Sequence, residues 1–256
     1  MKLKGKVAIV TGAGRGIGKS IATLLINEGA KIVVNDINNE WAENTVRELR
    51  KVGESIAIVA DVTKKVEVES MVKTTIKTFD RIDILINNAG LTIIRPAEEI
   101  TEEEWDKVIN VSLKGAFLCC QAVFGKMKKE GGGRIVNIAS MAAHGGVPFQ
   151  TPYCAAKTGI LGLTRVLAVE WAKYKINVNS VSPGATLTEQ FEESMSKLPS
   201  NFRKERERRI PLGRMATPED IAKAVLFFVS PESEYISGQN ICVDGAMQAL
   251  FSGYSF

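Results

Sequence analysis

The sequence has little of what a metal site or a disulfide-stapled fold requires. His144 is the only histidine, and the four cysteines contain no Cys-x-x-Cys pair. A single histidine excludes a histidine-rich metal site, and the cysteine spacing matches no disulfide framework. We therefore expect free thiols in a reducing compartment and no bound metal.

Long hydrophobic runs are also missing. The apolar run after the basic start of the chain covers only residues 7–10, which is too short for a signal peptide. The longest uncharged stretch, residues 135–156, is interrupted by Asn137, His144 and two prolines, so no segment is expected to span a membrane. These absences predict a cytoplasmic protein that has no membrane partner.

A strong excess of one charge is absent as well. Lysine and arginine together number 33, aspartate and glutamate 29, and the net charge is +4. Nucleic-acid-binding proteins usually cluster their basic residues, so no nucleic-acid partner is expected. The 256 residues are 45% hydrophobic and 24% charged, which excludes a disordered chain and allows a sizeable core.

Short apolar runs alternate with longer amphipathic stretches along the chain. Several runs, such as residues 135–138, are continuous rather than alternating, which is typical of parallel strands buried on both faces. The predicted strands are 7–10, 31–35, 55–60, 82–86, 134–138, 176–181 and 239–243. The predicted helices are 16–28, 40–51, 65–78, 102–129, 152–173 and 218–229. This order indicates an α/β fold, a doubly wound parallel sheet with helices on both faces.

No flexible linker divides the chain, so residues 1–256 are predicted to form a single domain. One polar segment, residues 185–214, contains Pro199 and Pro211 and breaks the rhythm. We interpret this segment as a substrate lid, because insertions at such positions often cover a ligand site.

A glycine-rich loop follows the first predicted strand and opens the first helix. Its sequence, residues 11–18, reads Thr-Gly-Ala-Gly-Arg-Gly-Ile-Gly, and its usable triplet is Gly12, Gly16 and Gly18. Glycines let the backbone turn sharply, and free amides at a helix N-terminus bind a pyrophosphate. A nucleotide triphosphate loop is disfavoured, because the glycine that it requires at position 13 is Ala13.

The choice between NAD and NADP depends on two residues. Asp36 ends the second strand 18 residues beyond Gly18, where an acid accepts hydrogen bonds from the adenine ribose hydroxyls and repels a 2′-phosphate. Arg15 favours the opposite choice, because a loop arginine is able to contact that phosphate. We predict NAD as the cofactor, with NADP the less favoured alternative.

A tyrosine and a lysine are spaced to share one helix face. Tyr153 and Lys157 stand at positions i and i+4. A tyrosine ordinarily titrates near ~10, and a neighbouring cation is expected to lower its pKa, which would suit general acid–base chemistry on an alcohol or carbonyl. Ser140 ends the fifth predicted strand, and Asn110 lies inside the long helix, where asparagine is unfavourable unless it has a polar role.

Together these motifs resemble the short-chain dehydrogenase/reductase family, and the resemblance covers residues 4–247. The matching motifs, in chain order, are Thr11-Gly12-x-x-x-Gly16-x-Gly18, Asp61-Val62-Thr63, Asn87-Asn88-Ala89-Gly90, Asn110, Ser140, Tyr153-x-x-x-Lys157, Pro183-Gly184 and Val243-Asp244-Gly245. The resemblance implies a seven-stranded parallel sheet and a catalytic tetrad of Asn110, Ser140, Tyr153 and Lys157.

The resemblance also implies a role for each of these residues. Tyr153 is the general acid/base, Lys157 lowers its pKa and holds the nicotinamide ribose, Ser140 orients the substrate oxygen, and Asn110 helps to hold a water. The implied cofactor-binding residues include Asp61 and Val62 at the adenine, Asn88 and Gly90 at the ribose, and Thr186 and Thr188 at the carboxamide. The remaining members of that set are Gly12, Arg15, Gly16, Ile17, Gly18, Asp36, Tyr153, Lys157, Pro183 and Gly184.

The predicted function is hydride transfer between NAD(H) and a small-molecule secondary alcohol or ketone, with sugars, polyols and sugar acids as the expected class. The alternatives are an NADPH-dependent 3-ketoacyl-type reductase and a cofactor-binding protein without catalysis. A homotetramer is implied by the resemblance. His144 is interpreted as a solvent-facing loop residue, and the charged run at residues 203–209 as a solvated helix face or a contact to an anionic substrate.

Overall fold

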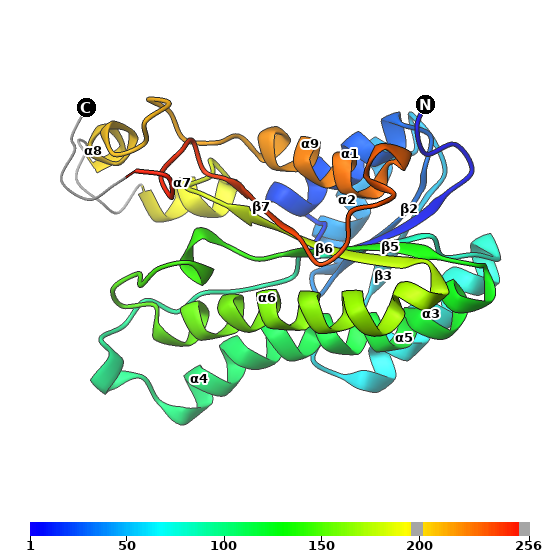
Figure 1. Ribbon diagram of the computed structural model, residues 1–256, viewed down its shortest axis with the longest axis horizontal. Coiled ribbons are helices and arrows are strands. Elements are labelled where there is room, and N and C mark those ends of the chain that lie inside the picture. Colours follow the sequence, from blue (N-terminus) through cyan, green and yellow to red (C-terminus); the bar gives the residue numbers. More distant parts are fainter. Residues whose placement is uncertain (196–201, 251–256) are drawn as a thin grey trace.

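A single parallel sheet forms the centre of the computed structural model, which describes residues 1–195 and 202–250 (Figure 1). Within these residues the sheet has seven strands in the order β3-β2-β1-β4-β5-β6-β7. The strands are β1 (Val7–Thr11), β2 (Lys31–Asp36), β3 (Ser55–Val59), β4 (Ile84–Asn87), β5 (Gly133–Ile138), β6 (Ile176–Pro183) and β7 (Asn240–Val243). The predicted fold class is confirmed, and the strand boundaries differ from the sequence prediction by one or two residues.

Helices cover both faces of this sheet (Figure 1). One layer contains α1 (Gly16–Asn27), α2 (Asn39–Leu49) and α9 (Pro218–Val229). The other contains α3 (Lys65–Phe79), α4 (Glu102–Ile109), α5 (Gly115–Lys129) and α6 (Thr151–Trp171). The central strand β1 is buried along its whole length, with Val10 packing into one layer and Ile9 into the other. Continuous apolar strands therefore arise here because both sheet faces are covered.

Local signals explain where several helices begin. Thr101 and Glu104 form a reciprocal capping box at the start of α4, and Thr217 and Asp220 form another at the start of α9. Asn38 accepts a hydrogen bond from the amide of Trp41 and so caps α2. Each cap satisfies amides that a helix leaves without intrahelical partners.

The strand order reverses direction beside β1, which pairs with β2 on one side and β4 on the other. Loops that leave the carboxyl ends of β1 and β4 consequently diverge and leave a crevice, the place where open α/β sheets bind their ligands. The glycine-rich loop after β1 and the Asn-Asn-Ala-Gly segment after β4 both lie at this crevice.

Residues 102–129 form one continuous helical stretch interrupted by a π-helical turn at Asn110–Lys114. By length and composition this stretch qualifies as a membrane span, because an 18-residue window within it has a mean hydropathy of 1.5, so the expectation that no segment qualifies was wrong in that respect. In the structure Val108, Cys120, Val123 and Met127 are buried, and the last three pack beneath the sheet. The apolar composition thus follows from its place as a core helix.

The predicted lid segment contains two short helices, α7 (Glu189–Met195) and α8 (Phe202–Arg208). Its ends are anchored, because Thr186 forms a bridge with Ala216 and because Ile210 and Met215 are buried. Residues 196–201 of this segment lie outside the described residues.

Candidate active site

The glycine-rich loop requires glycine for two separate physical reasons. Gly16 begins α1 with a φ of +58°, a conformation that other residues rarely adopt. A Cβ atom at Gly18 would lie 2.3 Å from the carbonyl oxygen of Gly12, inside contact distance. The loop therefore presents bare backbone at the N-terminus of α1, as a pyrophosphate site needs. Ile17, by contrast, packs its side chain against the core.

Asn88 holds this loop from the neighbouring strand. Its side-chain amide donates to the carbonyl oxygens of Thr11 at 3.0 Å and Gly12 at 2.9 Å. In return, the hydroxyl of Thr11 accepts hydrogen bonds from the backbone amides of Asn88 and Ala89. The amide group of Asn88 thus fixes the loop, while its contact with a cofactor ribose stays a prediction.

Asp36 lies directly against the loop at the end of β2. Its carboxylate accepts hydrogen bonds from the backbone amides of Gly14 and Asn38, both at 3.0 Å, and only 7% of the residue is exposed. The guanidinium of Arg15 stacks on the Trp41 ring, 4.0 Å from its centroid. Trp41 was not recognised from the sequence, where it is one more apolar position in an amphipathic helix.

The predicted adenine residues follow β3. Asp61 accepts hydrogen bonds from the amide and hydroxyl of Thr63, and its own amide donates to Glu67. Val62 is buried against Gly115, where an added Cβ would lie 2.8 Å from the valine side chain. Both residues have structural partners at the carboxyl edge of the sheet, and their contact with adenine stays a prediction.

Ser140, Tyr153 and Lys157 are brought together by β5 and the first turns of α6. Ser140 follows β5, accepts a hydrogen bond from the amide of Ala142 at 3.1 Å, and is hydrogen-bonded to Tyr153. The ammonium of Lys157 lies 5.6 Å from the centroid of the Tyr153 ring. The same ammonium donates to the carbonyl oxygen of Ile138 at 2.7 Å. The i, i+4 spacing therefore places both side chains toward the end of β5, as predicted.

The electrostatics of this pair differ from the sequence expectation. Burial raises the pKa of the Tyr153 phenol above its usual value, although the hydrogen bond with Ser140 opposes part of that rise. Burial also lowers the pKa of Lys157 to about 8, because the enclosed ammonium is separated from water. Lys157 does not counteract the effect of burial on Tyr153, so the expected lowering of the tyrosine pKa is not found.

Gly90 lies beside the ammonium of Lys157. A Cβ atom at Gly90 would lie 3.4 Å from that nitrogen and 3.5 Å from the hydroxyl of Ser112. Ser112 is buried and exchanges 3.4 Å hydrogen bonds with the backbone of Leu91. Ser112 was not recognised from the sequence, because a serine inside a helical stretch does not by itself indicate a functional site.

Asn110 is the first residue of the π-helical turn between α4 and α5. Its carbonyl oxygen accepts a hydrogen bond from the amide of Gly115, and the residue is half-buried. π-turns inside helices often occur at functional sites. The turn agrees with the inference that an asparagine in mid-helix has a particular role, and its hold on a water stays a prediction.

The segment after β6 reaches back to the glycine-rich loop. A Cβ atom at Gly184 would lie 2.8 Å from the Cα of Asp244, and Pro183 ends the strand paired with Val243. The Thr186 hydroxyl donates to the carbonyl of Gly184 at 3.0 Å. Thr188 caps α7 by accepting from Phe191 and lies beside Gly16. Thr188 is thus close to the loop, whereas the hydroxyl of Thr186 is used locally.

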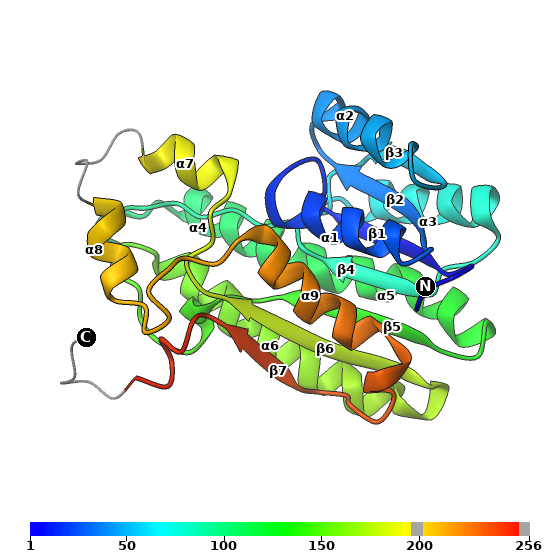
Figure 2. The same cartoon turned by 90° about the horizontal axis from the view of Figure 1, so that it is seen from above.

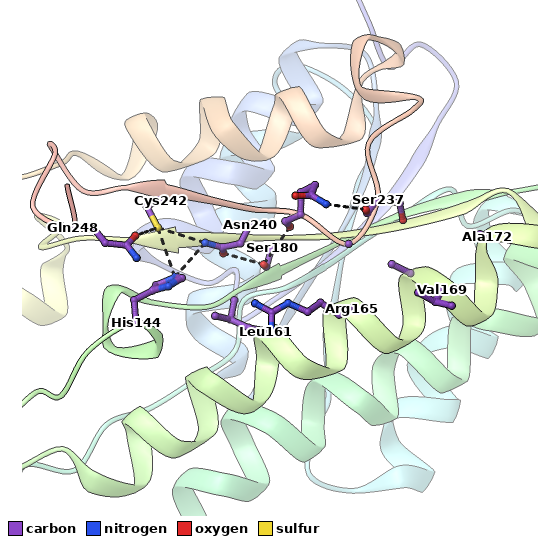
Figure 3. A pocket seen from close by; sticks show the side chains of 13 residues that line it. His144, Leu161, Arg165, Val169, Ala172, Ser180, Ser237, Asn240, Cys242 and Gln248 are labelled. Carbon is purple, nitrogen blue, oxygen red and sulfur yellow. Dashed lines mark hydrogen bonds between the residues drawn. The ribbon is translucent and has the colours of Figure 1, made fainter.

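A hollow of about 900 Å³ lies between α6 and β7 (Figure 3). Its polar end is a cluster in which the His144 ring lies 3.1 Å from the Ser182 hydroxyl and 3.2 Å from the Asn240 amide. Cys242 lies 3.6 Å from the same ring nitrogen. His144 is exposed, as expected, but it has polar partners that the sequence did not indicate. None of the four predicted catalytic residues lines this hollow.

The sheet order and the grouping of Ser140, Tyr153 and Lys157 near the end of β5 are typical of a dinucleotide-dependent oxidoreductase. A model of the family described as enoyl-(acyl carrier protein) reductase matches residues 12–248. The chain belongs to the short-chain dehydrogenase/reductase family, and it is an oxidoreductase of CH–OH groups that uses NAD(H) or NADP(H).

Three curated relatives align over nearly their whole length. A (2S)-[(R)-hydroxy(phenyl)methyl]succinyl-CoA dehydrogenase subunit from Thauera aromatica is 42% identical over 99% of this chain and 100% of the relative. A 3-oxoacyl-[acyl-carrier-protein] reductase from Thermotoga maritima is 41% identical over 96% of this chain and 99% of the relative. An NAD-dependent glycerol dehydrogenase from Listeria innocua is 40% identical over 94% of this chain and 92% of the relative.

The fold also matches solved structures. A structure described as a putative gluconate dehydrogenase from Agrobacterium tumefaciens superposes with a TM-score of 0.93 at 33% identity and covers 98% of both chains. The predicted family and enzyme class are therefore confirmed.

Proposed function

We propose that this enzyme uses NAD(H) to interconvert a secondary alcohol and a ketone, with a polyol, sugar or sugar acid as substrate. The observation that carries the choice of NAD is the buried carboxylate of Asp36, which lies against Gly14 of the glycine-rich loop. A 2′-phosphate placed beside this carboxylate would meet a like charge, which costs several kcal/mol at a binding site. The NAD-dependent glycerol dehydrogenase among the relatives supports the same choice.

The cofactor site fits a dinucleotide. Bare backbone at Gly12, Gly16 and Gly18 admits a pyrophosphate at the N-terminus of α1, and Gly90 lies beside Lys157. When bound, NAD(H) supplies the position that accepts or returns the hydride. Val62, Asn88, Thr186 and Thr188 complete the proposed walls of the site.

The chain's own residues move the proton. Tyr153 removes the hydroxyl proton of the alcohol during oxidation and returns it during reduction. Ser140 donates to the substrate oxygen and keeps it beside the phenol. Lys157, whose ammonium donates to the carbonyl of Ile138 and lies 5.6 Å from the centroid of the Tyr153 ring, would hold the nicotinamide ribose. Asn110 holds a water that links this lysine to solvent.

An NADPH-dependent 3-ketoacyl-type reductase is the second candidate. Arg15 favours it, because a loop arginine is able to contact a 2′-phosphate, and its guanidinium stacks on Trp41 beside Lys19 and Arg47. The 41% identity to a 3-oxoacyl-[acyl-carrier-protein] reductase points in the same direction.

One experiment separates the two candidates. Purified enzyme is assayed with NAD⁺ and NADP⁺ on polyols, sugars and sugar acids, and with NADH and NADPH on a 3-ketoacyl thioester. We expect the highest kcat/KM with NAD⁺ and a hydroxylated substrate. A higher kcat/KM with NADPH and the thioester would replace our proposal with the second candidate.

We also propose a cytoplasmic homotetramer that binds neither nucleic acid nor membrane, in which residues 185–214 act as a substrate lid. Phe117 on α5 and Val166 and Val169 on α6 are exposed apolar side chains, and Val169 is 79% exposed. Most of the other apolar residues of the 102–129 stretch pack inside the subunit, whereas Phe117 does not. Phe117, Val166 and Val169 therefore support a contact between subunits. Light scattering at micromolar concentration should give four times the chain mass of 27.9 kDa.

A further inference from the structure

Two carboxylates of α7 lie on the glycine-rich loop. The Glu189 carboxylate accepts a hydrogen bond from the backbone amide of Gly16 at 3.1 Å. The Glu193 carboxylate lies 3.3 Å from the guanidinium of Arg15 and forms an ion pair with it. Figure 2 shows α7 beside the turn that connects β1 to α1, although the two segments are far apart in sequence.

These contacts use groups that an incoming anion would also need. Gly16 is the first residue of α1, so its amide belongs to the set that a helix leaves free and that carries the positive end of the helix dipole. A phosphate oxygen and the Glu189 carboxylate cannot both accept from this amide in good geometry. Their negative charges would in addition repel each other at this distance.

Arg15 is occupied on two sides. Its guanidinium stacks on Trp41 and is paired with Glu193. A hollow of about 570 Å³ adjoins these groups and is bordered by the basic side chains of Lys19, Arg47 and Lys51. Lys19 is itself paired with Glu48 at 2.9 Å. α7 therefore supplies two carboxylates to the loop, in addition to the carboxylate that Asp36 supplies from β2.

We propose that Glu189 and Glu193 act as an internal anion, which the phosphates of the cofactor displace from the glycine-rich loop. Binding of the cofactor and release of α7 from the loop are then one event. The inference rests on the proposed dinucleotide site and adds a consequence: the two acids weaken cofactor binding, because part of the binding free energy is spent on separating them from the loop.

The test compares the charge-neutralised variant Glu189→Gln, Glu193→Gln with the wild type by calorimetric titration of NADH. One exposed ion pair and one exposed hydrogen bond are each weak, so we expect the double variant to bind NADH about three- to tenfold more tightly. The gain should shrink at high salt, where exposed charges are screened. Glu192→Gln on the same helix is the matched control, because Glu192 is exposed and does not contact the loop. This control variant should bind NADH with the affinity of the wild type.

A second measurement follows α7 in the wild type by hydrogen exchange of residues 189–195. We expect NADH, and inorganic pyrophosphate as a simpler anion, to speed up exchange when no substrate is present. Weaker NADH binding by the double variant, or slower exchange with NADH, would mean that the acids hold α7 over the bound cofactor, and would overturn the inference. Equal NADH affinities of the wild type and the double variant would also overturn the inference. Failure of the wild type to bind NADH or NADPH would refute the proposed function as well.

Discussion

The Lys157 ammonium donates a 2.7 Å hydrogen bond to the carbonyl of Ile138 and lies 5.6 Å from the Tyr153 ring centroid. This geometry joins the last residue of β5 to the first turns of α6, so one buried cation is fixed by the backbone and directed toward the phenol. The fold therefore holds the lysine through a backbone carbonyl, and burial lowers its pKa to about 8.

Removal of the Tyr153 hydroxyl should abolish most of the activity and leave cofactor binding nearly intact. General acid–base catalysis contributes ~10²–10⁴ in rate, and Tyr153→Phe keeps the ring and its packing. We expect kcat to fall by at least about 100-fold, while the Kd for NADH, measured by fluorescence, changes little. A variant that retains more than about a tenth of wild-type turnover would rule out Tyr153 as the acid/base.

Lys157 should make the stability of the protein depend on pH in a defined window. The folded protein lowers the pKa of Lys157 from 10.5 to about 8, so between these values the unfolded chain binds more protons. The free energy of unfolding should therefore rise with pH from about 8 to 10.5, by about 3 kcal/mol for this group. Below pH 8 the full cost of burying the charge is present.

Urea denaturation of the wild type and of Lys157→Met at several pH values measures this contribution. We expect the wild type to gain stability relative to the variant as the pH rises through that window, whatever the difference at pH 7. Parallel curves for the two proteins would show that Lys157 titrates at its ordinary pKa.

Asp36 should set cofactor choice. Asp36→Ala removes the acceptor for the adenine ribose hydroxyls, so NADH affinity should fall. It also removes the like charge beside a 2′-phosphate, so discrimination against NADPH should relax by at least about tenfold. The ratio of the two dissociation constants gives the result directly. Glu43→Ala removes an exposed acid from α2 and should leave this ratio unchanged. A wild type that prefers NADPH would contradict the role given to Asp36.

Gly18 should tolerate no side chain. A Cβ in Gly18→Ala would lie 2.3 Å from the carbonyl oxygen of Gly12 and 2.6 Å from the Asn88 amide, so the loop must move. We expect loss of NADH binding and lower thermal stability. Gly125→Ala is the control, because a Cβ there meets nothing within 4 Å and alanine favours a helix interior by roughly 0.5–1 kcal/mol. Equal effects of the two substitutions would mean that the close approach at Gly18 has no consequence.

The sequence alone determined the fold class, the single domain and most elements of the site. Continuous apolar runs such as residues 135–138 report burial on both sides, and a strand buried on both sides belongs to a covered parallel sheet. The glycine spacing of the loop, the i, i+4 pair of Tyr153 and Lys157 and the place of Ser140 after a strand are likewise local properties. They follow from local backbone geometry, which is determined by residues that are neighbours in the sequence.

The tertiary structure alone decided the properties that depend on residues distant in sequence. The order of the strands, the contact of Asp36 with Gly14, the stacking of Arg15 on Trp41 and the acids of α7 on the loop each join segments that periodicity cannot relate. The pKa values of Tyr153 and Lys157 belong to the same group. Their spacing suggested a lowered tyrosine pKa, but the cost of burying a charge depends on everything that excludes water from it, and that is settled only when the whole chain has packed.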